Sequence, residues 1–366
     1  MKICILGSKS YPPRIGGIET HVFELAQRLA LRGHEVNVIV GRDKNEKRYE
    51  KLDGVNVHRV AFIKSRFTTK ITMVPSAILL AKKIEADIHH THGGIFGFFH
   101  FLLSNNQFIH TAHGHGYHPG EYPFPFRHFA KVLDITSFKK AKQVIAVDSK
   151  TAEDVAKYNK HVHIIGNGIN IEKFDRQMPS PKEYKNDIKI LYVGRLIYRK
   201  GVHLLVEAFS KLPREIKEKA SLFIIGEGPM KSELLLKTKK QENINFLGYV
   251  ENIVSYLVHS DIFVLPSLYE GMPFTILEAM ASKCACISTT VGDLTSRFTN
   301  NRESIFVKPN DSGALAKALS MVITNNELRK KISHNGYEII KKEYSWDKII
   351  PRIEEIYRTF LSTQRR

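Results

Sequence analysis

Short apolar segments alternate with helical patterns along almost the whole sequence. Runs such as Lys2 to Leu6 and Ile262 to Leu265 have the length and composition of buried strands, and residues 18–31 carry apolar side chains at helical spacing. Strands that alternate with helices form parallel sheets with helices on both faces, so we expect an α/β fold. Further strands are expected at residues 35–40, 87–91, 108–111, 143–147, 190–193, 221–225 and 285–288.

The length of the chain favours two domains. A chain of 366 residues is long for one hydrophobic core, and 43% hydrophobic with 25% charged residues is the composition of a folded protein. The strand and helix alternation is interrupted between Asn167 and Asp187, a stretch that contains Pro179 and Pro181. We therefore expect an N-terminal domain over residues 1–170, a linker over 171–187 and a C-terminal domain over 188–345.

Two glutamates flank a turn between an expected strand and an expected helix. Residues 270–278 read Glu-Gly-Met-Pro-Phe-Thr-Ile-Leu-Glu. A helix that begins near Phe274 and Thr275 presents unpaired backbone N–H groups, and its positive end attracts anions. Acidic side chains beside an anion site suit a ligand with phosphates and hydroxyls, such as a nucleotide sugar. The helix dipole alone also favours a glutamate in a first turn, so either Glu270 or Glu278 could be structural.

A second strand-to-helix loop carries positive charge. Residues 194–201 read Gly-Arg-Leu-Ile-Tyr-Arg-Lys-Gly and follow the expected strand 190–193. Arginine offers phosphate oxygens a planar fork, whereas lysine supplies a compact charge. Arg195 and Lys200 in one loop, with carboxylates in another, fit a ligand that has one charged and one hydroxylated end.

These motifs resemble the C-terminal domain of the retaining glycosyltransferases of family four. The resemblance extends through nearly the whole chain, because N-terminal and linker motifs of that family occur in the same order. The matching motifs are Gly16-Gly17-Ile18-Glu19, Thr111-Ala112-His113-Gly114, Asn167-Gly168-Ile169-Asn170, Gly194-Arg195 with Lys200-Gly201, Gly226-Glu227-Gly228-Pro229, and Pro266-Ser267 with Glu270-Gly271 and Glu278-Ala279.

The resemblance implies the GT-B fold, in which two Rossmann-like domains face each other and a C-terminal helix, here residues 346–366, returns to the N-terminal domain. It also implies which residues act. The catalytic group comprises His113 at the donor sugar, Glu270 at the sugar hydroxyls or anomeric carbon, and Arg195 and Lys200 at the diphosphate. The donor-binding group comprises Gly16, Gly17, Gly194, Tyr249, Phe274, Thr275 and Glu278, with Glu278 at the ribose and the segment around Tyr249 near the base.

The expected reaction moves a sugar, most simply a hexose, from a nucleotide-diphosphate sugar to a lipid-linked or glycan acceptor. The sequence contains no Asp-x-Asp motif that could hold a divalent ion on the diphosphate. Fixed cations can stabilise the leaving group instead, so we expect metal-independent transfer without a cofactor. The resemblance favours attack of the acceptor from the same face as the leaving group. It leaves open a nucleophilic Glu270, the base, the sugar and the acceptor.

Histidine is concentrated in the first half, where 14 of the 17 histidines lie at or before residue 163. His89, His90 and His92 fall at the end of one expected strand, and His113 follows another. No cysteine or carboxylate lies among them at a spacing typical of zinc sites. The sequence therefore predicts no metal site.

The formal net charge of +18 is spread over both halves and comes with no nucleic-acid-binding motif. The run from Phe62 to Ile71 interleaves apolar residues with Lys64, Arg66 and Lys70, a pattern that suits an anionic membrane surface or an ordinary solvated loop. The sequence shows neither a signal peptide nor an apolar run of spanning length, and its three cysteines lie in strand-like runs. We expect a cytoplasmic protein that can associate with the inner face of the cell membrane.

Two other classes of function fit the same fold. A nucleotide-sugar epimerase would turn over the donor without an acceptor, and a non-catalytic nucleotide-sugar-binding protein would not turn it over at all. A phosphorylase would require a pyridoxal-binding lysine context, which the sequence lacks. A dinucleotide dehydrogenase is disfavoured because no G-x-G-x-x-G follows the first strand.

Overall fold

The computed structural model describes residues 1–13, 17–63, 68–104, 107–114, 126–185 and 187–364. The chain forms two compact units: Met1–Gly168 with Trp346–Arg366, and Ile169–Ser345. Residues 171–187, which we expected to form a linker, are part of the second unit. Each unit has its own sheet and its own hydrophobic core.

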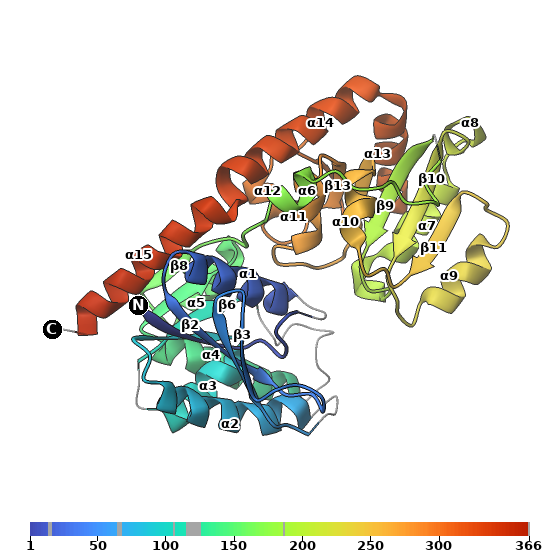
Figure 1. The fold of residues 1–366 in the computed structure, drawn as a ribbon. Helices are drawn as coiled ribbons and strands as arrows, with labels where there is room; N and C mark the ends of the chain where they lie inside the picture. Colours follow the sequence, from blue (N-terminus) through green and yellow to red (C-terminus); the bar gives the residue numbers. More distant parts are fainter. Residues whose placement is uncertain (14–16, 64–67, 105–106, 115–125, 186, 365–366) are drawn as a thin grey trace. The chain divides into compact units, whose positions relative to one another are not determined.

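The first unit contains, in its described part, an eight-stranded sheet with the order β3-β4-β2-β1-β5-β6-β7-β8 (Figure 1). Neighbouring strands run parallel except β3, which pairs antiparallel with β4. The strands are β1 Lys2–Leu6, β2 Glu35–Gly41, β3 Tyr49–Leu52, β4 Val55–Val60, β5 Ile88–His92, β6 Ile109–Ala112, β7 Gln143–Ala146 and β8 Val162–Ile164.

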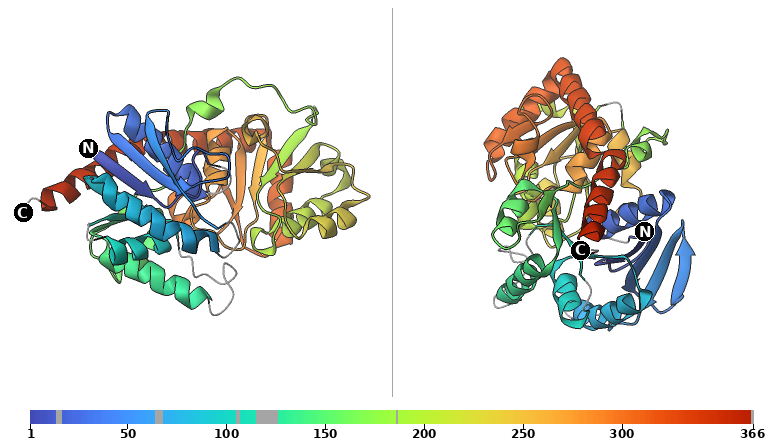
Figure 2. Two further views of the ribbon diagram at one scale, coloured as in Figure 1. Left: turned by 60° about the horizontal axis from the view of Figure 1, so that its bottom comes forward. Right: turned by 90° about the vertical axis from the view of Figure 1, so that its left-hand side faces the viewer.

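Helices cover both faces of this sheet, and strand β1 shows why. Ile3 and Ile5 pack with α1 and α15 on one face, whereas Cys4 and Leu6 pack with α2 and α3 on the other. Figures 1 and 2 show α1 and α15 side by side. Both faces of the central strands are buried, so β1 is apolar after its first residue, whereas β5 buries His89, His90 and His92. The helices are α1 Gly17–Leu31, α2 Thr68–Ile84, α3 Gly94–Leu103, α4 Phe126–Lys140, α5 Ser149–Ala156 and α15 Trp346–Gln364.

The second unit contains a parallel sheet of six strands within its described residues, in the order β11-β10-β9-β12-β13-β14. The strands are β9 Ile188–Val193, β10 Ala220–Ile225, β11 Ile244–Gly248, β12 Ile262–Leu265, β13 Ala285–Thr289 and β14 Ile305–Val307. The helices are α6 Glu172–Asp175, α7 Val202–Ser210, α8 Arg214–Lys217, α9 Lys231–Thr238, α10 Ile253–Val258, α11 Phe274–Ala281, α12 Leu294–Arg297, α13 Ser312–Thr324 and α14 Asn326–Ile339, with a 3₁₀ turn η1 Tyr198–Lys200 and a π-helical turn η2 Ile340–Tyr344.

A buried carboxylate fastens α15 to the rest of the first unit. Glu354 accepts hydrogen bonds from Arg32 at 2.7 and 3.0 Å, and it lies 3.0 Å from His34 Nε2 and 3.2 Å from Arg358. Hydrogen bonding to Arg32 lowers the pKa of the Glu354 carboxyl to about 2, against the opposing effect of burial. The charged form of Glu354 is therefore the one that holds the helix.

We expect Glu354→Gln to lower the free energy of unfolding by roughly 1.5 to 3 kcal/mol at pH 7, the range for hydrogen bonds to charged groups. A carboxyl whose folded pKa is lowered contributes its stabilisation above its usual pKa of 4.5 and loses it as the pH falls toward 2. Urea unfolding at pH 7 and pH 3 should therefore show a difference between wild type and variant that shrinks in acid. The neighbouring, exposed Glu355→Gln is the control, and equal losses in the two variants would contradict the assignment.

Candidate active site

Backbone contacts join the loops at the carboxyl edge of the second sheet. Gly201 has a φ of +67°, and a Cβ on it would lie 1.9 Å from the carbonyl oxygen of Pro266. Next to this contact, Leu268 N donates to Arg199 O at 2.8 Å. Only glycine permits so close an approach in the left-handed conformation. The loop after β9 is thus fixed against the loop after β12.

This junction brings Lys200 and Glu270 together. Lys200 Nζ lies 2.5 Å from Glu270 Oε1, and the same oxygen accepts a hydrogen bond from Ser267 Oγ at 2.7 Å. Glu270 is only 8% exposed and Ser267 is fully buried. A carboxylate this deep requires a cation and a donor, and the two loops supply both.

Arg195 and Gly194 lie in the same loop as Lys200. Gly194 N donates to Ile225 O at 3.0 Å, which ties the end of β9 to the end of β10. The Arg195 side chain is exposed, while its carbonyl accepts a hydrogen bond from Tyr192 Oη at 3.1 Å. Burial, assisted by the charge of Glu270, raises the pKa of Tyr192 well above its usual value, so the phenol remains a donor. The backbone of Arg195 is fixed while its guanidinium remains accessible to a ligand.

Helix α11 places the other expected donor-binding residues. Phe274 and Thr275 occupy its first turn and are half-buried, and no side chain caps this helix end among the described residues. Glu278 is half-buried one turn further along α11. Tyr249 follows β11 and is 66% exposed. The structure therefore brings Lys200, Glu270 and Ser267 into contact. Arg195 lies in the same loop as Lys200, whereas Glu278 and Tyr249 lie on two other segments of the same unit.

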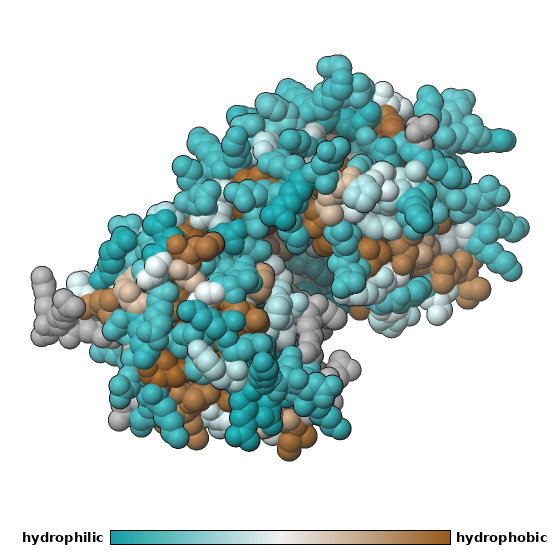
Figure 3. All heavy atoms as spheres, viewed as in Figure 1, coloured by the Kyte–Doolittle hydropathy of each residue, from teal (hydrophilic) through white to brown (hydrophobic). Residues whose placement is uncertain are grey.

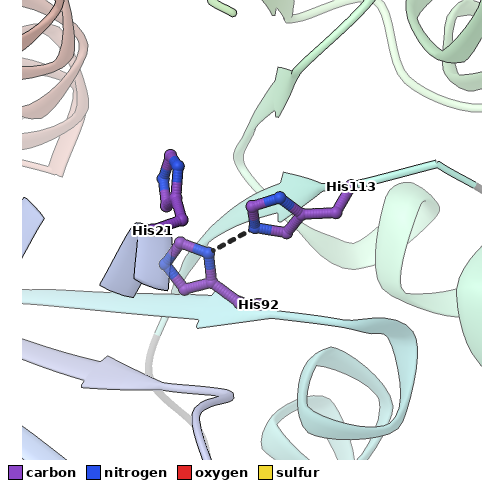
Figure 4. A group of neighbouring side chains, drawn as sticks. All are labelled: His21, His92 and His113. Atoms are coloured by element: carbon purple, nitrogen blue, oxygen red, sulfur yellow. Dashed lines mark hydrogen bonds between the residues drawn. The ribbon is translucent and has the colours of Figure 1, made fainter. Parts of the chain in front are cut away.

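In the first unit, His113 belongs to a cluster of imidazoles. His92 ends β5, His113 follows β6, and His21 lies in α1 (Figure 4). His92 Nδ1 lies 2.9 Å from His113 Nε2, and the His21 ring centroid lies 4.9 Å from that of His113. Burial lowers the pKa of His21 to about 4 and lowers the pKa values of His92 and His113 well below the usual value. All three rings are therefore neutral at pH 7.

The cluster is connected to helix α15. His90 Nδ1 lies 2.7 Å from Tyr357 Oη of that helix, and His90 Nε2 lies 2.7 Å from Thr111 Oγ1 on β6. Trp346, the first residue of α15, lies 5.4 Å from the His21 ring, centroid to centroid. Side chains from α15, β5 and β6 thus support the segment that carries His113.

The remaining expected positions lie in the first unit. Gly17 is exposed as the first residue of α1. Gly16, Lys64 and Arg66 lie outside the described residues, as does the side chain of Lys70.

Sequence reasoning did not include Ser267, His21 or His92 in the site. Ser267 precedes Glu270 by three residues, a spacing at which a loop side chain can return to a carboxylate. His92 ends β5 and His113 follows the adjacent parallel strand β6, and the carboxyl ends of the two strands must lie at one edge. The signal for His92 was therefore present in the strand pattern, whereas His21 comes from a helix whose orientation the sequence does not specify.

Two family models match consecutive parts of this chain. The model described as "Glycosyl transferases group 1" matches residues 173–339, and the model described as "Glycosyltransferase Family 4" matches residues 15–173. The chain belongs to the family 4 group 1 glycosyltransferases. It is an enzyme that transfers glycosyl groups, and its two mainly parallel sheets with flanking helices are those of the GT-B fold.

The similarity of this glycosyltransferase to known proteins extends over nearly its full length. It is 29% identical to an uncharacterized glycosyltransferase of Methanocaldococcus jannaschii over 98% of both chains. It is 27% identical to the phosphatidylinositol N-acetylglucosaminyltransferase gpi3 subunit of Schizosaccharomyces pombe, over 96% of this chain and 79% of the yeast one. The structure of HepE from Anabaena in complex with UDP-glucose has a TM-score of 0.78 at 16% identity and covers 98% of this chain and all of HepE.

A second histidine pair on the other face of the first sheet gives this glycosyltransferase a predicted pH dependence. Both nitrogens of His100 are buried without a hydrogen-bond partner in the described structure, and the ring lies 5.0 Å from that of His89. Burial lowers the pKa of His100 to about 3. The free energy of unfolding is therefore not reduced by His100 at a pH above its usual pKa of 6.5. As the pH falls below 6.5 the protein becomes less stable, because the unfolded chain binds a proton that the folded chain excludes.

Between pH 6 and pH 4 the free energy of unfolding of wild type should decrease more steeply with falling pH than that of His100→Leu. The two slopes should differ by about 1.4 kcal/mol per pH unit, the value for one proton. Urea unfolding can be followed by the fluorescence of Trp346, the single tryptophan, which lies in the first unit. The exposed His161→Leu should leave the slope of wild type. A His100→Leu slope equal to that of wild type would contradict the prediction.

Proposed function

We propose that this glycosyltransferase is a retaining, metal-independent enzyme that moves a hexose from a nucleotide-diphosphate sugar to a lipid-linked or glycan acceptor. The observation that carries the proposal is the contact of Lys200 with Glu270, because it combines a cation with a carboxylate at the sheet edge, in the loop that also carries Arg195. Such a combination matches a ligand with a diphosphate and a sugar.

The proposed chemistry follows from the charge that develops. Cleavage of the bond between the anomeric carbon and the diphosphate leaves an oxocarbenium-like sugar and a more negative leaving group. Arg195 and Lys200 stabilise the leaving diphosphate, and the N–H groups at the start of α11 can add to this. The acceptor hydroxyl attacks from the face of the leaving group, and a diphosphate oxygen takes its proton.

The remaining groups orient the donor in this proposal. Glu270, held by Ser267 and Lys200, accepts hydrogen bonds from sugar hydroxyls. Glu278 on α11 binds the ribose. Gly194, after β9, lies near the phosphates, and the segment around Tyr249, after β11, lies near the base. We assign His113 to the donor sugar, as the family resemblance implies. Its neutral ring can either donate or accept a hydrogen bond.

The comparisons support a choice of donor and acceptor class. HepE was crystallised with UDP-glucose, and its fold matches this chain throughout. The Schizosaccharomyces pombe relative belongs, by its name, to an N-acetylglucosaminyltransferase that acts on phosphatidylinositol. We propose a UDP-sugar as the first donor to be tested and a lipid-linked molecule as the first acceptor.

The diphosphate clamp is tested by Arg195→Ala, whose side chain is exposed, so the fold should survive. Loss of one charged hydrogen-bonding partner removes about 1.5 to 3 kcal/mol, and we expect kcat/KM to fall roughly ten- to a few-hundred-fold. The kcat/KM of Lys200→Ala should fall at least as far, because this substitution also leaves Glu270 without its cation. Lys211→Ala removes a lysine paired with Glu207 in α7 and is the matched control.

The same assay tests metal independence. Wild-type transfer, measured as release of nucleoside diphosphate, should survive EDTA. Loss of turnover in EDTA with recovery on addition of Mg²⁺ would show that the fixed cations do not suffice.

The two glutamates should separate ground-state binding from turnover. Glu278→Ala should weaken the binding of the bare nucleoside diphosphate and of the intact donor by the same factor. The reason is that a ribose contact exists in both the ground state and the transition state. Glu270→Gln should retain affinity for the bare nucleotide and lose mainly kcat. Calorimetric titration with both ligands, combined with steady-state kinetics, makes the comparison. Equal loss of nucleotide affinity in the two variants would refute these roles.

We also propose that the protein binds an anionic membrane surface. No helix in the described part of the chain is long and apolar enough to cross a bilayer. The face in Figure 3 is mainly hydrophilic, with apolar side chains in small groups, and Lys82 and Lys83 are exposed at the end of α2. Anionic headgroups attract each nearby cation by about 1 kcal/mol.

Changing Lys64, Arg66 and Lys70 together to Gln should reduce co-sedimentation with anionic vesicles at low salt, because fewer cations then face the surface. Hydrolysis of the soluble donor should remain nearly unchanged. Vesicles of neutral lipid are the control. If wild type ignores anionic vesicles even at low salt, the acceptor is soluble and the charge has another role.

A further inference from the structure

Three imidazoles that are far apart in the sequence meet in the first unit. One nitrogen each of His21, His92 and His113 lies within 4.8 Å of the others. Figure 4 shows the rings turned toward one another from α1, the end of β5 and the segment after β6. Neighbouring ring centroids lie 4.9 to 5.4 Å apart.

Two of these rings carry nitrogens that the described structure does not satisfy. His21 Nδ1 and His92 Nε2 are buried without a hydrogen-bond partner, and their side chains are 3% and 0% exposed. Buried polar atoms are nearly always hydrogen-bonded, and exceptions call for a physical explanation. Each neutral imidazole keeps one lone pair, which a proton or a metal ion can occupy.

We propose that His21, His92 and His113 bind a first-row transition metal ion of the Zn²⁺ class. Imidazole nitrogens lie about 2.0 to 2.1 Å from zinc, which places the ligand atoms of a tetrahedral site roughly 3.3 Å apart. The ligand atoms of the cluster lie within 4.8 Å of one another. His92 Nδ1 and His113 Nε2 are 2.9 Å apart, so an ion between them would replace their hydrogen bond. Ring rotations that move the nitrogens by about 1 Å would complete the geometry.

The ligand set indicates the class of ion. Imidazole favours zinc, copper or nickel, whereas magnesium and calcium require oxygen ligands. Within the described residues the cluster comprises three ligands only, so a fourth position remains for water or another small ligand. Only His113 of the three is more than slightly exposed, so the ion would enter from its side.

Metal occupancy has a consequence that rests on the proposed function. A metal ion would take the lone pair of His113 and remove this ring from the donor sugar. We therefore expect the ion to inhibit transfer and EDTA to restore it. Metal binding itself is measured without donor or acceptor, so its outcome does not depend on the proposed reaction.

Cobalt provides the direct test, because Co²⁺ bound tetrahedrally through imidazoles absorbs visible light. Titration of the full chain should give one saturating site whose spectrum zinc abolishes by displacement. His21→Phe keeps the ring packing against Trp346 but removes one ligand. It should weaken binding by more than the roughly 10- to 100-fold typical of losing only an outer-shell partner. His334→Phe, at an exposed position on α14, should bind as wild type does.

A second measurement needs no variant. X-ray absorption of the wild-type protein with one equivalent of zinc should show scattering from three imidazoles. Absence of a saturating site at micromolar Co²⁺, equal affinity in His21→Phe, or fewer than three imidazoles around zinc would each overturn the proposal. Zinc that binds but leaves the transfer rate unchanged would overturn the inhibitory consequence.

Discussion

The loops that follow parallel strands all leave the sheet at its carboxyl edge. This constraint determines where residues from distant parts of the sequence can come together in both units. In the second unit the loops after β9, β10, β12 and β13 all leave from the carboxyl edge. Close backbone contacts then fix the loops to each other, as where a Cβ on Gly292 would lie 1.9 Å from the carbonyl oxygen of Gly271. Residues 70 apart in sequence, Lys200 and Glu270, become neighbours for this reason. Open α/β sheets commonly bind ligands at this edge.

The contact between Lys200 and Glu270 is better understood as preorganisation than as a source of stability. A largely buried ion pair loses solvation on both sides, and its net contribution is often small. Its value lies in geometry: Glu270 has two oxygens, and one of them is bonded to both Lys200 and Ser267. In the proposed reaction, Lys200 keeps further N–H donors for phosphate while Glu270 keeps an oxygen for a hydroxyl. The pair therefore holds a cation and a carboxylate ready at a spacing that suits a single ligand.

Strands buried on both faces could be predicted from the sequence, and strands at the edges could not. The expected segments at β1, β9, β12 and β13 agree with the structure within two residues, because strands between two helix layers are mostly apolar. The antiparallel β3 reads Tyr-Glu-Lys-Leu, and β14 has three residues. The side chains of β3 are exposed or half-buried, and β14 is too short to show a pattern, so both segments resemble loops. Their strand character depends on a neighbour that the sequence does not specify.

The candidate residues of the two units differ in how far local sequence determines their positions. Lys200 and Glu270 lie in the loops that follow β9 and β12, so these loops could be predicted from the strand ends. The hydrogen bond between Ser267 and Glu270 could not, because it depends on the conformation of the loop. The imidazole cluster instead depends on α1 and α15, which pack on one sheet face through Val22, Leu25 and Ile353. A helix rotated by one residue would turn His21 by about 100° and separate it from His92. The cluster is therefore a product of tertiary packing, and a substitution on α15 can disturb His113 without contacting it.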